Sequence, residues 1–175
     1  MSLITELERL ADGLMESPDA ANPISWPTVA ERIAKNMGVK SDEVGILGVS
    51  QRWRHLYFLV PEALKNVGFI PMTSNSALAA RTARESRPEI NNAFSNSKHA
   101  TVFEAVKTGA ETAEAIQKII SAPILSGDKV IGVIQISRKG ANAKTVGPDF
   151  TPADLGKVLA LCKPLGKLLQ HFARS

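Results

Sequence analysis

The sequence predicts an α+β domain in which an antiparallel β-sheet is flanked by helices on both faces, with long helices at the N- and C-termini. Three observations lead to this prediction. Leucines recur at helical spacing near the N-terminus, an apolar hairpin lies in the last third of the chain, and a capped amphipathic helix follows it. Short helical and strand-like segments alternate between these ends, in an order that is typical of an α+β domain.

The length and composition are those of one soluble globular domain. The chain has 175 residues, of which 44% are apolar and 22% charged, and its longest apolar runs are far shorter than the roughly 20 residues that cross a bilayer. The N-terminus does not resemble a secretory signal, so we expect a cytoplasmic protein without a membrane partner. The 21 basic and 17 acidic residues are scattered along the chain, which predicts no nucleic-acid partner.

The chain begins with a predicted amphipathic helix that runs to about Glu16. Its leucines step by four, three and four residues, which places them on one stripe of a helix. Two prolines in the next seven residues break this helix. We therefore assign residues 1–24 to an N-terminal helix and linker, and residues 25–175 to the core of a single domain. The stripe consists of Leu3, Leu7, Leu10 and Leu14.

The middle of the chain alternates between short helices and strands. A second helix from about Ser25 to Asn36 ends at Gly38, a typical C-terminal cap. Runs rich in Val, Ile and Leu between polar residues are typical of strands, whereas helical spacing marks the segments between them. The predicted strands are residues 43–50, 54–60, 68–72 and 88–92, and the first two are expected to pair antiparallel. The predicted helices are residues 61–66, 77–84, 99–106 and 110–120, the second of them after the capping segment 73–76.

An apolar hairpin and a long helix form the last third of the chain. Residues 126–129 supply the turn, and the returning strand is apolar on both faces, which predicts cover on both sides. Polar Gln135 and Ser137 indicate that the layer over one face of that strand is incomplete toward the strand's end. The last helix, from about Thr151 to Phe172, begins with a capping box. Its surplus apolar surface favours a partner, and its heptad row consists of Leu155, Val158, Cys162, Leu165, Leu169 and Phe172.

Two segments carry a resemblance to a known family. Residues 122–155 contain Ala-Pro-Ile, then Val-Ile-Gly-Val-Ile-Gln-Ile, then Phe-Thr-Pro-Ala-Asp-Leu. Residues 76–92 form a helix and strand pattern that is matched by Leu78, Arg81, Ala83, Arg87, Pro88 and Asn91. Together they resemble a GAF domain, a small-molecule-sensing module of signalling proteins, over about residues 25–175. The chain departs from the family pattern at Ala80, Ser86 and Asn92.

The resemblance implies a GAF-like sheet with a ligand pocket and leaves the ligand and any cofactor open. Two of the five residues of the cyclic-nucleotide signature are replaced, and the one cysteine, Cys162, lies on the last helix rather than before the hairpin, where bilin-carrying relatives need it. A single cysteine has no resolving partner, which argues against the methionine sulfoxide reductases of this fold. The sequence shows no nucleophile–base pair, metal cluster or phosphate loop, so we predict neither an enzyme nor a metal site.

The resemblance places the pocket between the sheet and the segments around residues 74–108. Aromatic residues on strands would floor it, Arg81 would clamp an anionic group, and His99 would donate to the ligand or bind haem. The alternatives are aromatic residues that only fill the core, an Arg81–Glu85 surface pair, and a solvated or capping His99. The predicted ligand-binding residues are Tyr57, Phe69, Arg81, Asn91, Asn92, Phe94 and His99.

We predict a sensory or regulatory domain that binds an unidentified small molecule, forms a homodimer and acts in trans on a separate signalling protein. The alternative is a dimerising adaptor with a collapsed pocket. The terminal helices would form the dimer interface through Leu3, Leu7, Leu10, Leu14, Leu165, Leu169 and Phe172.

One polar motif lies outside this prediction. Residues 52–55 read Arg-Trp-Arg-His, which has the basic and aromatic character of a nucleic-acid contact. We interpret these residues as the tip of a hairpin that carries a few exposed cations.

Overall fold

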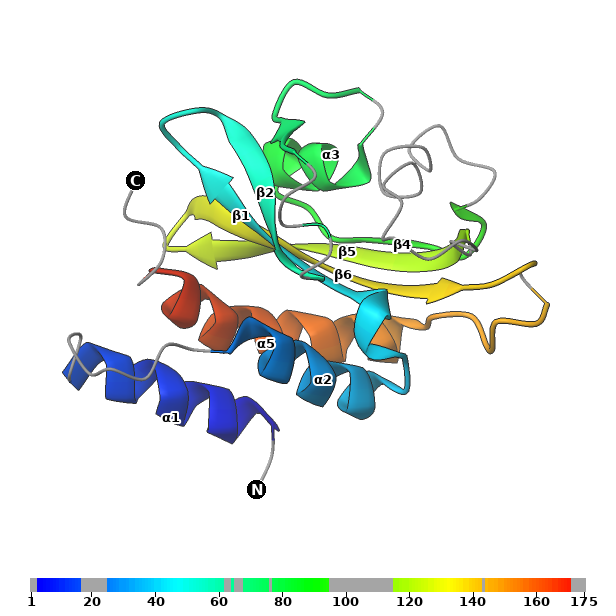
Figure 1. The fold of residues 1–175 in the computed structure, drawn as a ribbon, viewed down its shortest axis with the longest axis horizontal. Coiled ribbons are helices and arrows are strands. Elements are labelled where there is room, and N and C mark those ends of the chain that lie inside the picture. The colour runs from blue at the N-terminus through cyan, green and yellow to red at the C-terminus, as the bar shows by residue number, and fades with distance from the viewer. Residues whose placement is uncertain are drawn as a thin grey trace.

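The computed structural model describes residues 3–16, 25–61, 64, 68–75, 77–94, 115–142 and 144–170, apart from the side chains of residues 13–16. Within these residues the chain forms a curled six-stranded sheet with helices on both faces (Figure 1). The α+β class that the sequence predicts is confirmed.

Every neighbouring pair of strands in the sheet is antiparallel, in the order β3-β2-β1-β6-β5-β4. The predicted pairing of residues 43–50 with residues 54–60 is confirmed, as is the apolar hairpin. Gly127 has a φ of 65° in the hairpin's two-residue turn, a conformation that glycine tolerates best. The strands are β1 (Val44–Ser50), β2 (His55–Val60), β3 (Ile70–Pro71), β4 (Glu89–Asn91), β5 (Ile116–Ser126) and β6 (Lys129–Lys139).

Three helices lie on one side of the sheet and one lies on the other. α2 (Trp26–Met37) and α5 (Pro152–Gln170) pack on the sheet, and α1 (Leu3–Glu16) packs mainly on α5. α3 (Leu78–Glu85) covers the opposite face (Figure 1). Among the described residues, no helix is both long enough and apolar enough to cross a membrane.

Local sequence sets the ends of these helices as predicted. Ser25 caps the start of α2, and Gly38, in the left-handed conformation, ends it. At the start of α5, the Thr151 hydroxyl accepts from the Asp154 backbone N–H, and the Asp154 carboxylate accepts from the Thr151 backbone N–H. This reciprocal pair is the predicted capping box.

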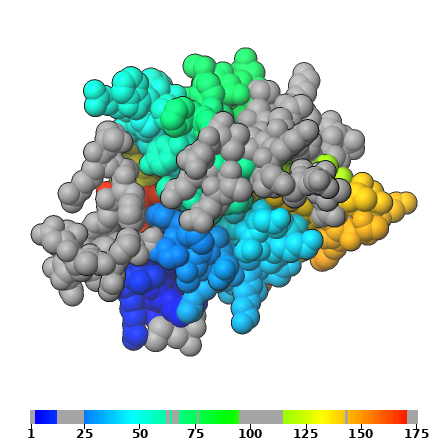
Figure 2. Space-filling model, viewed as in Figure 1, coloured from blue at the N-terminus to red at the C-terminus, as the bar shows by residue number. Residues whose placement is uncertain are grey.

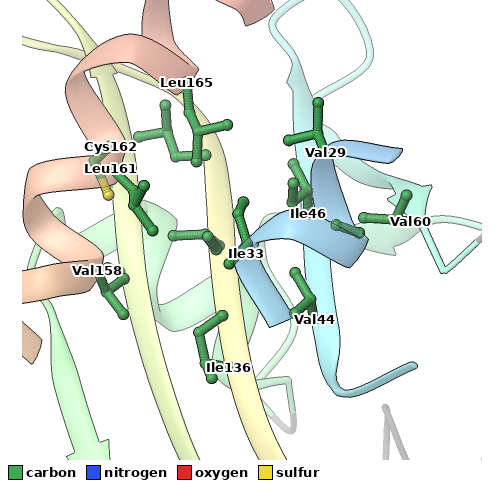
Figure 3. Packing of buried hydrophobic residues seen from close by; sticks show 14 of the residues in the cluster. Val29, Ile33, Val44, Ile46, Val60, Ile136, Val158, Leu161, Cys162 and Leu165 are labelled. Carbon is green, nitrogen blue, oxygen red and sulfur yellow. The ribbon is translucent and has the colours of Figure 1, made fainter. Parts of the chain in front are cut away.

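The main core lies between the sheet and the helices α2 and α5 (Figure 3). Ile33 from α2, Ile46 from β1 and Leu165 from α5 meet there with no exposed surface. Leu165 and Leu169, which we assigned to a dimer interface, thus pack inside the chain's own core. Their apolar spacing is accounted for without a second copy of the chain, because a helix that covers a sheet needs the same spacing as a helix that faces a partner helix.

The predicted helix over residues 110–120 is wrong from residue 116 onward, where the chain forms β5. Ile116, Ile119 and Ile120 fit helical spacing, but β5 pairs with β6 along its length, and β-branched side chains pack well on a sheet. The helix predicted after residues 73–76 is confirmed as α3, whereas the strand over residues 68–72 is reduced to β3. The helix predicted at residues 99–106, and all of residues 61–66 except 61 and 64, lie outside the described residues.

Candidate functional site

A small cavity lies between α3 and the sheet, in the region where the sequence places the pocket. Its volume is about 10 Å³, near the minimum of about 10–15 Å³ that holds one water molecule. All but one of its described lining residues are apolar, and the exception is the amide of Gln135 on β6. The lining consists of Ile70, Ala77, Leu78, Ala79, Phe94, Ile119 and Gln135.

A chain of buried hydrogen bonds runs from this cavity to α3. The Gln135 amide Nε2 donates to Ser121 Oγ at 3.1 Å, and Ser121 Oγ lies 2.7 Å from Thr82 Oγ1. Thr82 Oγ1 in turn donates to the Leu78 carbonyl at 3.0 Å, one turn back along α3. All three polar side chains are buried. Because Thr82 lies on α3, the chain of bonds links the floor of the cavity to the helix that covers it.

The Gln135 amide is the polar group in the described lining of the cavity. Among the described residues, its Nε2 donates to the side chain of Ser121. The sequence drew attention to Gln135 as a polar residue in an apolar strand. It gave no signal for Ser121 and Thr82, which are 39 residues apart and meet only in the fold.

Of the predicted ligand-binding residues, Phe94 is the one that lines the cavity. Its side chain is buried, and it packs in a cluster with Leu78, Ile116 and Ile119. Phe94 therefore fills space between α3 and β5 that a ligand would need. His99 lies outside the described residues.

The two predicted asparagines bond to the backbone. Asn92 bridges to the residue before the α5 cap: its Nδ2 donates to the Phe150 carbonyl at 3.0 Å, and its Oδ1 accepts from the Phe150 N–H at 2.8 Å. Asn91 Oδ1 accepts from the Ala93 N–H in a local turn. Asn92 thereby ties the end of β4 to the start of α5.

Arg81 stands on α3 between two carboxylates. Its Nε donates to Glu85 at 2.9 Å, and its Nη2 lies 3.1 Å from Glu89. The hydrogen bond with Glu85, followed by the charge of Glu89, raises the pKa of Arg81. The Arg81–Glu85 pair is the alternative that the sequence offered. Contact between Arg81 and a ligand stays a prediction.

Tyr57 and Phe69 lie together, but in a different hollow from Phe94. Both line an open groove beside the turn between β1 and β2, and they share no lining residue with the cavity under α3. The Tyr57 ring lies over Gly48, where a β-carbon would come within 2.4 Å of it. Burial raises the pKa of Tyr57, so its hydroxyl stays a proton donor at neutral pH.

The Cys162 thiol is expected to be unreactive in the folded protein at pH 8. Burial in the main core raises its pKa to about 12 (Figure 3), and the thiolate is the reactive form. Ellman's reagent should therefore react only after unfolding in guanidinium chloride. Complete reaction within seconds in the folded state would contradict this prediction.

The same pKa fixes the direction of a pH effect on stability. The unfolded thiol ionises near pH 9 and the folded thiol near pH 12. The unfolded state therefore loses its proton first as pH rises, so the contribution of Cys162 is intact below pH 9 and is lost between about pH 9 and 12. Replacing Cys162 by alanine should flatten this part of the curve of unfolding free energy against pH, measured by urea denaturation.

Among the residues that the structure describes, no group of three or more His, Cys, Asp or Glu side chains is placed to hold a metal ion.

No family model matches the sequence, and no curated protein matches it either. Solved structures match the fold. The GAF domain of a phosphoenolpyruvate-protein phosphotransferase from Acinetobacter is similar with a TM-score of 0.63 at 15% identity, and the match covers 98% of this chain and 95% of that one. The GAF domain of a two-component sensor histidine kinase from Bacillus halodurans is similar with a TM-score of 0.57 at 14% identity, over 86% and 97% of the two chains. The chain therefore has the GAF fold.

The comparisons overturn the prediction that the chain is not an enzyme. The free methionine-R-sulfoxide reductase from Neisseria meningitidis, solved in complex with its substrate, is similar with a TM-score of 0.61 at 16% identity, over 98% of this chain and 88% of that one. The prediction rested on the single cysteine and on the lack of a nucleophile–base pair, and these do not exclude an enzyme on a fold that an enzyme shares. An enzyme is thus possible on this fold, and identities this low show the fold alone.

Proposed function

We propose that this chain is a small-molecule-binding sensory domain that acts in trans on a separate signalling protein, with its ligand between α3 and the sheet. The observation that carries the proposal is Gln135, a buried amide that lines an otherwise apolar cavity. Apolar pockets with a few placed polar groups are typical of small-molecule sites. The sensor kinase neighbour is a signalling protein that carries this fold.

The volume of the cavity indicates how binding becomes a signal. A space of about 10 Å³ admits no more than about one water molecule, so a ligand enters only if Phe94 moves out. Two residues before Phe94, Asn92 holds the backbone of Phe150 at the start of α5. Displacement of Phe94 therefore pulls on Asn92, whose side chain links the end of β4 to the segment before α5, and α5 carries the change to the outer face of the domain.

The test is a thermal-shift screen of a metabolite library on three proteins: the unaltered chain, Gln135→Leu and Gln117→Leu. A ligand at 100 times its Kd adds about 2.7 kcal/mol of stability, which raises the Tm of a chain of this size by about 5–10 °C. We expect Gln135→Leu to abolish the shift. Gln117→Leu is the matched control, because it removes an equally buried amide that bonds to Gly140 and does not line the cavity. The site would be refuted by compounds that still raise the Tm of Gln135→Leu, or by compounds that no longer raise the Tm of Gln117→Leu.

A groove between α1 and α2 favours a second candidate function, dimerisation. Its volume is about 460 Å³, and leucines from the predicted stripe line it. Leu7 is buried in the core, but Leu10 keeps 48% of its surface exposed. An exposed leucine beside an apolar groove is typical of an interaction surface. The groove is lined by Leu3, Glu6, Leu7, Arg9, Leu10, Thr28, Val29 and Arg32.

Leu10→Asp is expected to shift the protein from dimer to monomer in sedimentation velocity, because a carboxylate would have to be buried at the interface without a partner. Leu159→Asp on α5 is the control, since Leu159 is exposed to a similar degree and does not line the groove. A chain that sediments as a monomer before any substitution would exclude dimerisation as its function.

A further inference from the structure

A second hollow lies at one end of the sheet, in the turn between β1 and β2. Figure 2 shows this turn, in cyan, projecting from the body of the molecule at the upper left. The turn and the segment before β3 enclose an open groove of about 540 Å³, lined by Ser50, Trp53, His55, Tyr57 and Phe69. We call it the aromatic groove. Four of its five described lining residues have aromatic rings.

Two rings of the aromatic groove, those of Trp53 and Phe69, are largely exposed to solvent. Trp53 is 65% exposed and Phe69 is 66% exposed, more than the other large apolar side chains described. The His55 ring stacks on Phe69 with 4.1 Å between ring centroids and 23° between ring planes. Large exposed rings beside a hollow are typical of a binding surface, and ring faces are surfaces on which a planar molecule stacks.

The charge around the groove selects an anion. The Arg52 guanidinium lies 5.1 Å from the centre of the Trp53 ring, and Arg54 is exposed on the same turn. Neither arginine has an ion-pair partner among the described residues, and no carboxylate is among the groove's described lining. Two unpaired cations repel a cationic ligand of the kind that aromatic cages bind, and they attract an anionic group.

The turn is held in place before any ligand arrives. The Ser50 hydroxyl accepts from the Trp53 N–H, the Ser50 carbonyl accepts from the Arg54 N–H, and the Met72 N–H donates to the Arg54 carbonyl. Arg54 has a φ of 53°, a left-handed conformation that costs a non-glycine residue about 1 kcal/mol. Glycine would adopt it without this cost. Strain of this kind clusters at functional sites.

We propose that the aromatic groove binds a planar aromatic anion with the chemistry of a nucleotide. The base stacks on the rings of Trp53 and Phe69, and the phosphate pairs with Arg52 and Arg54. The volume of about 540 Å³ is within the 300–1,000 Å³ of small-molecule sites. A free nucleotide and a single-stranded nucleic acid present the same chemistry. The compact groove, with five described lining residues, favours the free nucleotide.

The probe is AMP, and its binding is measured by isothermal titration calorimetry at 50 mM salt. AMP should bind at least tenfold more tightly than adenosine, which lacks the phosphate, and than ribose 5-phosphate, which lacks the base. Trp53→Ala and Arg52→Ser should each weaken AMP binding on the order of tenfold. Arg9→Ser is the matched control, because it removes the charge of an exposed arginine on α1 and should leave binding unchanged.

Three results would overturn the proposal. They are the absence of any heat of AMP binding, adenosine that binds as tightly as AMP, and an equal loss of AMP affinity in Arg9→Ser and Arg52→Ser. A ten-nucleotide oligothymidylate distinguishes the sources. If the oligonucleotide binds as tightly as AMP or more weakly, the ligand is a free nucleotide. If it binds a hundredfold more tightly than AMP, and its affinity falls steeply with salt, the ligand is a nucleic-acid strand. Because the substituted side chains are exposed, each variant should keep its Tm within about 2 °C of the unaltered chain.

Discussion

Leu165→Asp should unfold the protein. Leu165 has no exposed surface and packs between α5 and the sheet in the main core (Figure 3). Truncating a buried leucine costs about 2–5 kcal/mol, and an unpaired carboxylate in its place adds several more. The sum reaches the whole stability of a typical domain, about 5–15 kcal/mol. Far-UV circular dichroism at 25 °C should show the loss of helix and strand signal.

Leu159→Asp provides the control on the same helix. Leu159 is 43% exposed, so a carboxylate there stays in water and should change the Tm by no more than about 2 °C. A folded Leu165→Asp protein with an unchanged Tm would contradict the core described here, and would place Leu165 at a surface instead. The pair of variants thus separates a residue that builds the fold from one that is free to meet a partner.

Gly132→Val should lower the Tm by about 6–12 °C. Gly132 lies on β6, where a β-carbon would come within 2.7 Å of the Leu47 carbonyl oxygen on β1 and 2.6 Å of Leu169 Cδ1 on α5. The carbonyl belongs to the backbone of the neighbouring strand, so it moves only if the sheet deforms. Overpacking of this kind costs about 1–3 kcal/mol or more, and about 3 kcal/mol corresponds to the expected shift in a chain of this size.

The matched control is Gly156→Ala, on the exposed side of α5. A β-carbon at Gly156 would meet nothing within 4 Å, and alanine favours a helix over glycine by about 1 kcal/mol. Gly156→Ala should therefore raise the Tm by a few degrees in differential scanning calorimetry. A Gly132→Val protein as stable as the unaltered chain would show that α5 does not press on the sheet at this point.

The elements that local chemistry determines were predictable from the sequence. Gly38 ends α2, and Thr151 with Asp154 begins α5, because a cap depends on residues three or four positions apart. Residues 116–120 were mispredicted because the spacing of their isoleucines fits a helix. They form a strand because they pair with β6, which comes later in the chain. Leu165 shows the same limit, since one apolar spacing serves a helix against a sheet and a helix against a second chain.

The candidate site was predictable in its place but not in its polar contacts. The resemblance located a pocket between the sheet and α3, and Phe94 lines the cavity there. Ser121 and Thr82 carry no local signal, because a serine in a strand and a threonine in a helix are ordinary on a surface, and their 2.7 Å contact exists only in the folded chain. Asn92 was predicted to bind the ligand, yet its amide is bonded to the backbone of Phe150.

Native mass spectrometry of the protein as purified from cells tests the ligand site most directly. The unaltered chain is expected to carry a discrete extra mass that is absent from Gln135→Leu and kept in Gln117→Leu, because Gln135 is the polar residue in the described lining of the cavity and Gln117 does not line it. A bare unaltered chain, or the same extra mass on Gln135→Leu, would contradict the site beneath α3.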